Sequence, residues 1–198
     1  NHFYDRFRDR IMFPIRNRKG ETIAFGGRII GAGEPKYLNS PETSVFHKGK
    51  ELYGLYELRR DVRNYNEILV VEGYMDVVMM SHFGIQNVVA TLGTAMSSTQ
   101  VSNLFRYTHS VVFCFDGDTA GLNAAYKAME NALPVMHSEK EIRFLFLPDN
   151  HDPDSYLKEY GREAFNQLVN NATPLSEYLF NHFENKYPLE TLEGRSQL

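Results

Sequence analysis

The chain has 198 residues, of which 42% are hydrophobic and 23% charged. This composition is ordinary for a globular protein and excludes an intrinsically disordered one. No apolar stretch approaches the roughly 20 residues that a membrane helix requires, and the first residues do not form a signal peptide, so we expect a cytoplasmic protein. The single cysteine, Cys114, lies in an apolar run, which predicts a core residue and excludes a disulfide framework or a cysteine-based zinc site.

The net charge of −4 hides an asymmetry. Residues 1–63 carry 13 Lys and Arg against 8 Asp and Glu, which gives +5, whereas residues 64–198 carry 8 against 17, which gives −9. This division suits a polyanion bound to the first part while metal cations neutralise the second. Two ordinary solvated faces are the alternative interpretation.

The first third of the chain predicts a small α+β unit. Charged and aromatic residues alternate in residues 1–10, and residues 12–15 and 21–25 predict the two strands of a hairpin whose turn is basic. The glycines of residues 26–33 permit close backbone approach to a ligand, although as a phosphate-binding signal they are weak.

A loop and a helix are expected next. Residues 34–50 are rich in turn formers and predict an ordered loop, and residues 51–63 predict a helix that ends at a hinge over residues 64–66. Arg28, Lys36 and Lys48 are candidates for phosphate contacts, although single cations in loops are usually only solvated.

From residue 67 onward, apolar runs and helical patterns alternate. The expected elements are a strand at 67–72, a helix at 76–83, a strand at 87–91, a helix capped by Ser97 or Ser98, a strand at 110–115, a helix at 119–133 and a strand at 142–147. This alternation predicts a parallel sheet with helices on both faces. Residues from 155 onward are predicted to be helical, with a turn at Gly161, a break at Thr173-Pro174 and no stop signal in residues 189–198.

Carboxylates follow three of the predicted strands. They are Glu72, Asp76, Asp116, Asp118, Asp152 and Asp154. Because the carboxyl ends of parallel strands meet at one edge of a sheet, we expect these six acids to lie together. Such a cluster persists when its members share protons or when cations occupy it, and Mg²⁺ or Mn²⁺ prefers oxygen ligands. Two or more ions at this edge would suit phosphoryl transfer.

Each acid also has a structural interpretation. Glu72, Asp76, Asp152 and Asp154 each lie where a carboxylate caps a helix or stands in its first turn. The coincidence of acids at three strand ends is what favours a metal site. The loop 91–94 leaves the second strand at the same edge, either as a simple turn or as a substrate contact.

Two motifs resemble a known family. Residues 71–76, Val-Glu-Gly-Tyr-Met-Asp, and residues 115–121, Phe-Asp-Gly-Asp-Thr-Ala-Gly, look like the Toprim domain shared by bacterial-type primases, topoisomerases and certain nucleases. Residues 6–15, 25–28, 35–43 and 46–49 resemble the bacterial replicative DNA primases (the DnaG family) more specifically, and the likeness runs from about Arg6 to Ala164.

The resemblance implies a fold, an activity and a set of site residues. It implies a Toprim-type parallel sheet at 66–153, preceded by a basic subdomain at 1–65 and followed by a helical subdomain at 154–198, which together copy single-stranded DNA into a short RNA primer from ribonucleoside triphosphates. It also implies that Glu72, Asp116 and Asp118 are the essential acids, with Asp76, Asp152 and Asp154 completing the metal site. The implied nucleotide and template contacts are Arg6, Arg8, Arg10, Arg28, Lys36, Asn39 and Lys48.

The resemblance also implies what lies elsewhere in such a protein. The zinc-binding module and the domain that binds the replicative helicase are absent from this sequence, so zinc is not expected here. We expect the protein to be a monomer. A Toprim nuclease, which would share the acids, remains an alternative, as does a catalytically inactive fragment that binds single-stranded DNA. A topoisomerase is disfavoured because no tyrosine nucleophile stands out.

Overall fold

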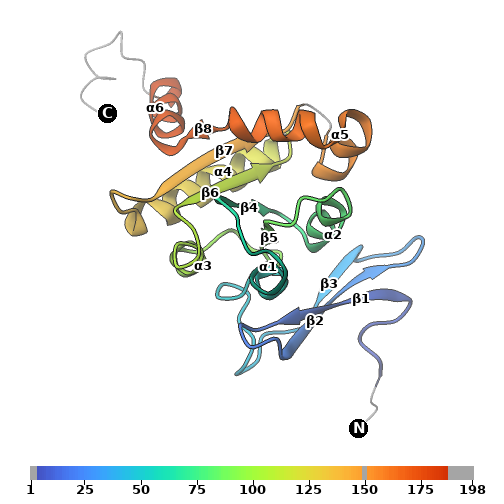
Figure 1. Cartoon of the computed structure of the whole chain (residues 1–198). Helices are drawn as coiled ribbons and strands as arrows, with labels where there is room; N and C mark the ends of the chain where they lie inside the picture. The colour runs from blue at the N-terminus through green and yellow to red at the C-terminus, as the bar shows by residue number, and fades with distance from the viewer. Residues whose placement is uncertain (1–3, 149–150, 187–198) are drawn as a thin grey trace.

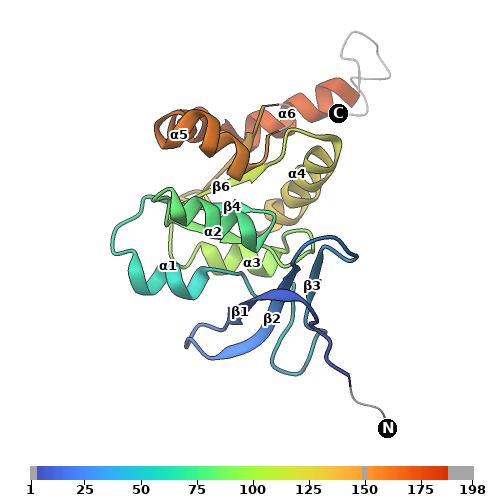
Figure 2. The ribbon, with the colours of Figure 1, turned by 90° about the vertical axis from the view of Figure 1, so that its right-hand side faces the viewer.

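The computed structural model describes residues 4–148 and 151–186 and contains two β-sheets. The smaller sheet, near the N-terminus, lies below the larger one, and helices α1 (Leu55–Asp61) and α3 (Ser98–Leu104) lie between the two (Figures 1 and 2). None of the helices in these described ranges is long and apolar enough to cross a bilayer.

The smaller sheet has three strands. β1 (Arg10–Arg16) and β2 (Thr22–Ile29) form the expected antiparallel hairpin. β3 (Tyr37–Asn39) adds to β2 and was not predicted, because residues 34–50 were expected to form a loop. A strand of three residues is too short for an alternating pattern to be visible among turn-forming neighbours.

The larger sheet has the order β5-β4-β6-β7-β8. The parallel arrangement of β4 (Glu67–Val71), β5 (Val88–Ala90), β6 (Ser110–Phe115) and β7 (Glu141–Phe146) confirms the prediction. The expected break at Thr173-Pro174 is a two-residue antiparallel edge strand, β8. Proline is tolerated there because an edge strand needs no second row of backbone donors.

The remaining helices are α2 (Tyr74–His82), α4 (Thr119–Ala132), α5 (Pro153–Asn170) and α6 (Leu175–Lys186), with a short 3₁₀ helix, η1 (Leu133–Val135). Ser97 is the N-cap of α3, and α5 turns at Gly161, where φ is 81°. The helix expected at 51–63 begins only at Leu55, because Tyr53 pairs with Ala90 of β5 and Gly54 has a φ of 84°. The prediction for residues 189–198 lies outside the described residues.

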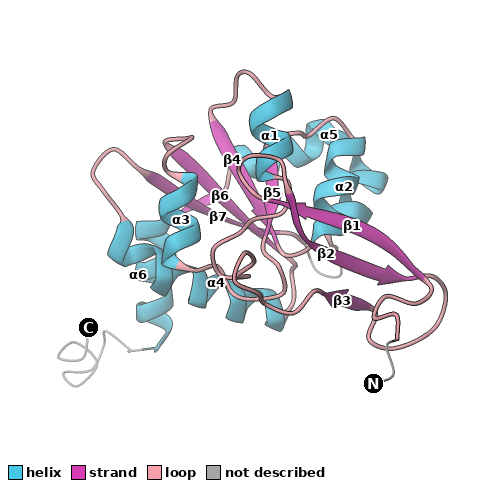
Figure 3. Cartoon of the chain, turned by 90° about the horizontal axis from the view of Figure 1, so that it is seen from below, coloured by secondary structure: helices cyan, strands magenta, loops and turns pink. Residues whose placement is uncertain are grey.

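The strands of the larger sheet are buried on both faces. Along β6, Val111, Phe113 and Phe115 face one apolar cluster, whereas Val112 and Cys114 face the other, so Cys114 is a core residue as predicted. Figure 3 shows α3, α4 and α6 on one side of the strands and α2 and α5 on the other. A strand covered on both faces reads as a continuous apolar run, which explains the sequence pattern.

The two sheets are joined by apolar and polar contacts. Ile15, Ala24 and Phe46 of the N-terminal part share a buried cluster with Leu92 from the turn after β5. The ring of Phe13 packs on that of Tyr74 with centroids 4.8 Å apart. The N-terminal sheet is therefore held against the edge of the larger sheet where β4 and β5 end.

Gln100 of α3 fixes the loop that carries Lys48. The side chain is fully buried, and its Nε2 donates hydrogen bonds to the carbonyls of Lys48 and Glu51 at 2.9 and 2.7 Å, while its Oε1 accepts from the backbone of Ser97 at 2.9 Å. We expect Gln100→Leu to lower the free energy of unfolding by about 3 kcal/mol, because it leaves buried carbonyls unpaired. Chemical denaturation measures this, with exposed Gln86→Leu as control; equal stability of the two variants would contradict the assignment.

Candidate metal and nucleotide site

The first two acids stand at neighbouring strand ends. Glu72 follows β4 and Asp116 follows β6, and these strands pair in parallel with Val70 opposite Phe113. The backbone of Asp116 contacts the carboxylate of Glu72 closely enough to influence its pKa. The predicted convergence at the carboxyl edge therefore holds for this pair.

Asp116 lies at the centre of the cluster. Partial burial and the negative charges of Glu72, Asp76, Asp152 and Asp118 together raise the pKa of its carboxyl group to about 7, and burial has the largest effect. Each of these four acids is therefore near enough to repel a charge on Asp116. A carboxyl group in this setting is easily protonated unless a cation balances the charge.

Asp76 shows the same behaviour from α2. Burial raises its pKa to about 6, with contributions from Asp152, Glu72 and Asp154, although a hydrogen bond from the backbone N–H of Gly73 at 3.0 Å opposes the shift. Although Glu72 is exposed as a whole, partial burial of its carboxyl group raises its pKa, with a smaller contribution from Asp118. All six predicted acids thus belong to one electrostatic cluster.

Two of the acids are also the N-caps of helices. Asp118 accepts a hydrogen bond from the backbone of Gly121 at 2.7 Å at the start of α4, and Asp152 accepts one from Ser155 at 2.7 Å at the start of α5. Burial favours the neutral form of Asp152, but the hydrogen bonds from Ser155 outweigh it, so the pKa is lowered. The structural interpretation is therefore correct for Asp152, whereas the cap made by Asp118 was not predicted, and both caps place helix N-termini at the cluster.

Asp154 has one carboxylate oxygen available. Its Oδ2 pairs with Lys158 at 2.7 Å, whereas its Oδ1 is buried and has no hydrogen-bond partner. A buried carboxylate oxygen without a partner is costly. A cation or a water molecule that a cation holds would satisfy it.

The acids suit divalent ions that a substrate helps to hold. Within the described ranges, no three Asp, Glu, His or Cys side chains are already arranged to hold a metal ion. Mg²⁺ and Mn²⁺, however, commonly bind through one or two carboxylates and complete their shells with water and phosphate oxygens. Mutual repulsion, oxygen-only donors and the unpaired oxygen of Asp154 all match this mode.

Two of the predicted cations stand beside the cluster. The guanidinium of Arg28 and the ammonium of Lys36 lie over the ring of Tyr37, 5.8 and 5.7 Å from its centroid. Burial raises the pKa of Tyr37, Arg28 lowers it, and Asp76 and Asp152 raise it, so the Tyr37 hydroxyl lies near Arg28 and near these two acids. Tyr37 was not among the predicted site residues.

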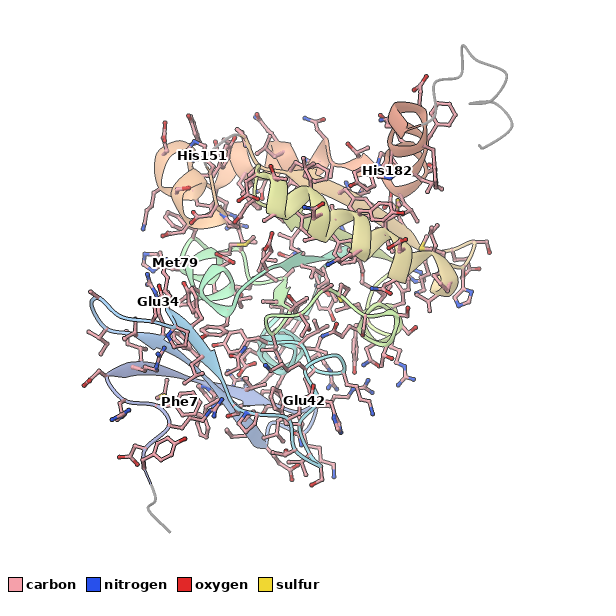
Figure 4. The ribbon with its side chains drawn as sticks, turned by 180° about the vertical axis from the view of Figure 1, so that it is seen from behind. Phe7, Glu34, Glu42, Met79, His151 and His182 are labelled. Carbon is pink, nitrogen blue, oxygen red and sulfur yellow. The ribbon has the colours of Figure 1, made fainter. Side chains whose placement is uncertain are left out.

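Figure 4 labels three residues that are close in sequence to Lys36, Asp76 and Asp152. Glu34 in the loop before β3, Met79 on α2 and His151 just before α5 follow one another along one side of the molecule. These segments carry Lys36, Asp76 and Asp152, respectively, which is why residues far apart in the sequence meet here.

Other predicted contacts have structural partners. The Nδ2 of Asn39 donates to the carbonyl of Leu92 at 3.0 Å, and its Oδ1 is buried without a partner. The guanidinium of Arg10 donates to the carbonyls of Pro35 at 2.7 Å and Lys36 at 3.3 Å. Arg10 therefore shapes the loop that presents Lys36, and Asn39 ties the smaller sheet to the turn after β5.

The last predicted contacts are less constrained. Arg6 donates a long hydrogen bond of 3.4 Å to the carbonyl of Asn39, and Arg8 is exposed. Lys48 belongs to the loop that Gln100 fixes, with its backbone N–H bound to Glu42 at 2.9 Å. Arg28 and Lys36 therefore lie near the acids, whereas no contact among the described residues places Arg8 or Lys48 beside them.

A pocket of about 410 Å³ opens beside Glu72. It lies over the ends of β4 and β6 and is closed by the turn after β5 and by α4, with polar groups from Thr91, Thr94, Asn123 and Lys127. Thr91, Gly93 and Thr94 of the loop 91–94 line this cavity at the acidic edge, and a substrate contact by the loop stays a prediction. Asn123 and Lys127 were missed because, on a helix, they look like ordinary solvated residues.

Two successive segments of the chain match known domain families. Residues 66–144 match the Toprim domain, which agrees with the acids and the parallel sheet. The chain is therefore a Toprim protein. Residues 1–59 match the N-terminal domain of the DNA primase catalytic core. The chain belongs to the DNA primase family.

Relatives and solved structures agree with this assignment. The chain is 55% identical to a DNA primase of Pseudomonas aeruginosa over 196 residues and 51% identical to that of Escherichia coli strain K12 over 195 residues, covering 98% of the chain in both cases. It covers 30% and 34% of those proteins, so it spans about a third of the curated primases that it matches.

The fold agrees equally well. A crystal structure of a primase domain from Pseudomonas aeruginosa matches 98% of the chain with a TM-score of 0.94 at 54% identity, and the chain covers 61% of that structure. The structure of a DnaG primase catalytic domain bound to single-stranded DNA matches 98% with a TM-score of 0.94 at 51% identity, with 63% of it covered.

Proposed function

We propose that this chain is the part of a DNA primase that holds the metal ions and the incoming nucleotide during DNA-templated synthesis of an RNA primer. The observation that supports this most is the six-acid cluster at the carboxyl edge of the sheet, with Arg28 and Lys36 beside it. The names of the relatives support the same activity.

In the proposed site, the acids bind the metal ions and the cationic side chains bind the nucleotide. Glu72, Asp116 and Asp118 would hold Mg²⁺ or Mn²⁺, with Asp76, Asp152 and Asp154 completing the site. Two or more such ions supply an activated 3′-hydroxyl and neutralise the charge of the departing pyrophosphate. Arg28 and Lys36 bind and orient the triphosphate, and the helix caps of Asp118 and Asp152 fix their carboxylates before substrate arrives.

The basic first part would hold the template. Single-stranded DNA is bound in the structure of a related primase core, and Arg6, Arg8, Arg10, Asn39 and Lys48 are the proposed contacts here. We further propose the division into parts at 1–65, 66–153 and 154–198, a monomer acting in the cytoplasm, and contact with the replicative helicase through a domain outside this sequence.

A single incubation tests the activity. The protein is mixed with a single-stranded DNA template, the four ribonucleoside triphosphates and Mn²⁺, and both labelled DNA and labelled RNA products are resolved. We expect short RNA and intact DNA. Shortened DNA without RNA would instead indicate a Toprim nuclease, and DNA binding with neither product would indicate a fragment that binds but does not catalyse.

Removal of the paired cations should weaken nucleotide binding. Because Arg28 and Lys36 share the ring of Tyr37, we expect Arg28→Ala/Lys36→Ala to weaken Mn²⁺-dependent binding of a ribonucleoside triphosphate by about tenfold or more, since charge-assisted hydrogen bonds to phosphate are lost. Equilibrium dialysis measures this. The control Arg162→Ala removes an exposed arginine of α5 and should change nothing; equal affinities of all three proteins would contradict the assignment.

A further inference from the structure

A hollow of about 660 Å³ lies at the opposite edge of the larger sheet from the acids. It is formed by the end of α1, the segment that leads into β4 and the end of the turn after α3, and its lining includes two arginines, two tyrosines and two asparagines, namely Arg59, Arg63, Tyr65, Tyr107, Asn64 and Asn66. No acid is among the described residues that line it, although residues 64–198 carry a net charge of −9.

The arginines and tyrosines of this hollow are already close together. The guanidinium of Arg59 lies 4.9 Å from the ring centroid of Tyr107. Burial raises the pKa of Tyr65, the positive charge of Arg59 lowers this pKa, and Tyr107 raises it. Arg59 and Tyr107 are therefore both near the Tyr65 hydroxyl. Both tyrosines also pack against the apolar cluster of the sheet, which keeps their rings in place. Preordered aromatic rings beside arginines are the typical platform for stacked bases.

The hollow is continuous with the basic N-terminal part. The turn between β1 and β2 carries Arg18, whose backbone carbonyl accepts a hydrogen bond from Arg59 at 3.2 Å. The side chain of Arg18 bonds to Asn103 of α3, so the turn is anchored beside the hollow. The acids nearest in sequence pair with arginines outside the hollow: Glu57 with Arg16, Asp61 with Arg60 and Glu67 with Arg143. A path of positive charge therefore runs from the hairpin turn to the hollow.

The hollow is too far from the acids to belong to the same site. β4 has five residues between the two edges of the sheet, which at about 3.3 Å per residue separates them by roughly 17 Å. A single nucleotide bound among the acids does not reach this distance, whereas a strand of several nucleotides does.

We propose that this hollow is a second contact for single-stranded nucleic acid, in which Tyr65 and Tyr107 stack on bases and Arg59 and Arg63 bind phosphates. The inference rests on the proposed function in one respect, namely that the chain binds single-stranded nucleic acid at its basic first part. Template DNA and newly made RNA share the chemistry that the hollow recognises.

Binding of 20-nucleotide strands of DNA and of RNA, measured by fluorescence anisotropy over a range of salt concentrations, tests the proposal. For Arg59→Ala/Arg63→Ala we expect about tenfold weaker binding at low salt and a salt slope smaller by about 1.4, because each phosphate contact on a single strand contributes about 0.7. Tyr107→Leu should weaken binding several-fold, whereas Tyr107→Phe, which keeps the ring, should bind like the unaltered protein. Arg162→Ala is the matched control.

The outcomes separate the proposal from the function on which it rests. If Arg6→Ala/Arg8→Ala, which removes two of the proposed template contacts, weakens binding of the strands but Arg59→Ala/Arg63→Ala behaves like Arg162→Ala, the second contact is refuted while the proposed function stands. If the unaltered protein binds neither strand, both are refuted. A loss confined to DNA assigns the hollow to the template, and a loss confined to RNA assigns it to the product; either supports the proposal.

Discussion

Replacing Asp116 by Asn should abolish Mn²⁺-dependent stabilisation and primer synthesis while making the metal-free protein more stable. The carboxyl group of Asp116 is surrounded by four other acids, so its charge is unfavourable unless a cation is present. An uncharged amide of the same shape removes this repulsion and also removes a metal ligand. We expect a gain of about 1 kcal/mol without metal, since solvent screens much of the interaction at a half-buried group.

The same residue should make the metal-free protein sensitive to pH. The pKa of Asp116 rises from an ordinary 3.8 to about 7 on folding, so the folded state binds the proton more tightly. Its contribution to stability is therefore complete below about pH 4 and is lost as the pH rises through 7. Thermal unfolding without metal should show a midpoint that falls as the pH rises from about 4 to about 7, and Asp116→Asn should flatten this fall.

The control for this prediction is Glu163→Gln, which removes an exposed carboxylate of α5. It should leave both the Mn²⁺ shift and the pH dependence unchanged. If Asp116→Asn retained the Mn²⁺ shift, or if it destabilised the metal-free protein, Asp116 would not be a crowded metal ligand.

Replacing Gly117 by Ala should strongly destabilise the fold near the site. A Cβ atom at Gly117 would lie closer to the backbone carbonyls of Leu147 and Pro148 than real Cβ contacts allow. Because those oxygens belong to the backbone after β7, relief requires β6 and β7 to separate just below Asp116 and Asp118. We expect a loss of about 3 kcal/mol of unfolding free energy together with weaker Mn²⁺ binding.

Gly49→Ala provides the matched control, since a Cβ there meets no atom within 4 Å. Chemical denaturation and Mn²⁺ titration of the two variants measure the difference. If Gly117→Ala were as stable as Gly49→Ala, the close packing of the two strand ends would be wrong.

Much of the fold was predictable because the chain's pattern is locally consistent. The runs before Glu72 and Asp116 are long, apolar and followed by glycine, which identifies buried parallel strands and sharp turns. Parallel strands end at a common edge, so the convergence of these acids followed from topology alone. The structure confirms that Asp152 caps a helix and adds that Asp118 caps one as well.

What escaped prediction depends on contacts between distant segments. β3 and β8 have three and two residues, and each exists only because a longer strand lies beside it. Tyr37 lies near both cations and acids through the pairing of β3 with β2, which no local pattern reveals. Asn39 was expected to contact nucleotide or template, and its bond to Leu92 shows in addition how the two sheets are joined.

The most direct test is a crystal grown with Mn²⁺ and a ribonucleoside triphosphate, examined for anomalous scattering. The site predicts manganese peaks between the triphosphate and the carboxylates of Glu72, Asp116 and Asp118. Peaks located elsewhere, or a bound triphosphate with no manganese beside these three acids, would contradict the claim that the acids at the strand ends jointly hold the catalytic ions.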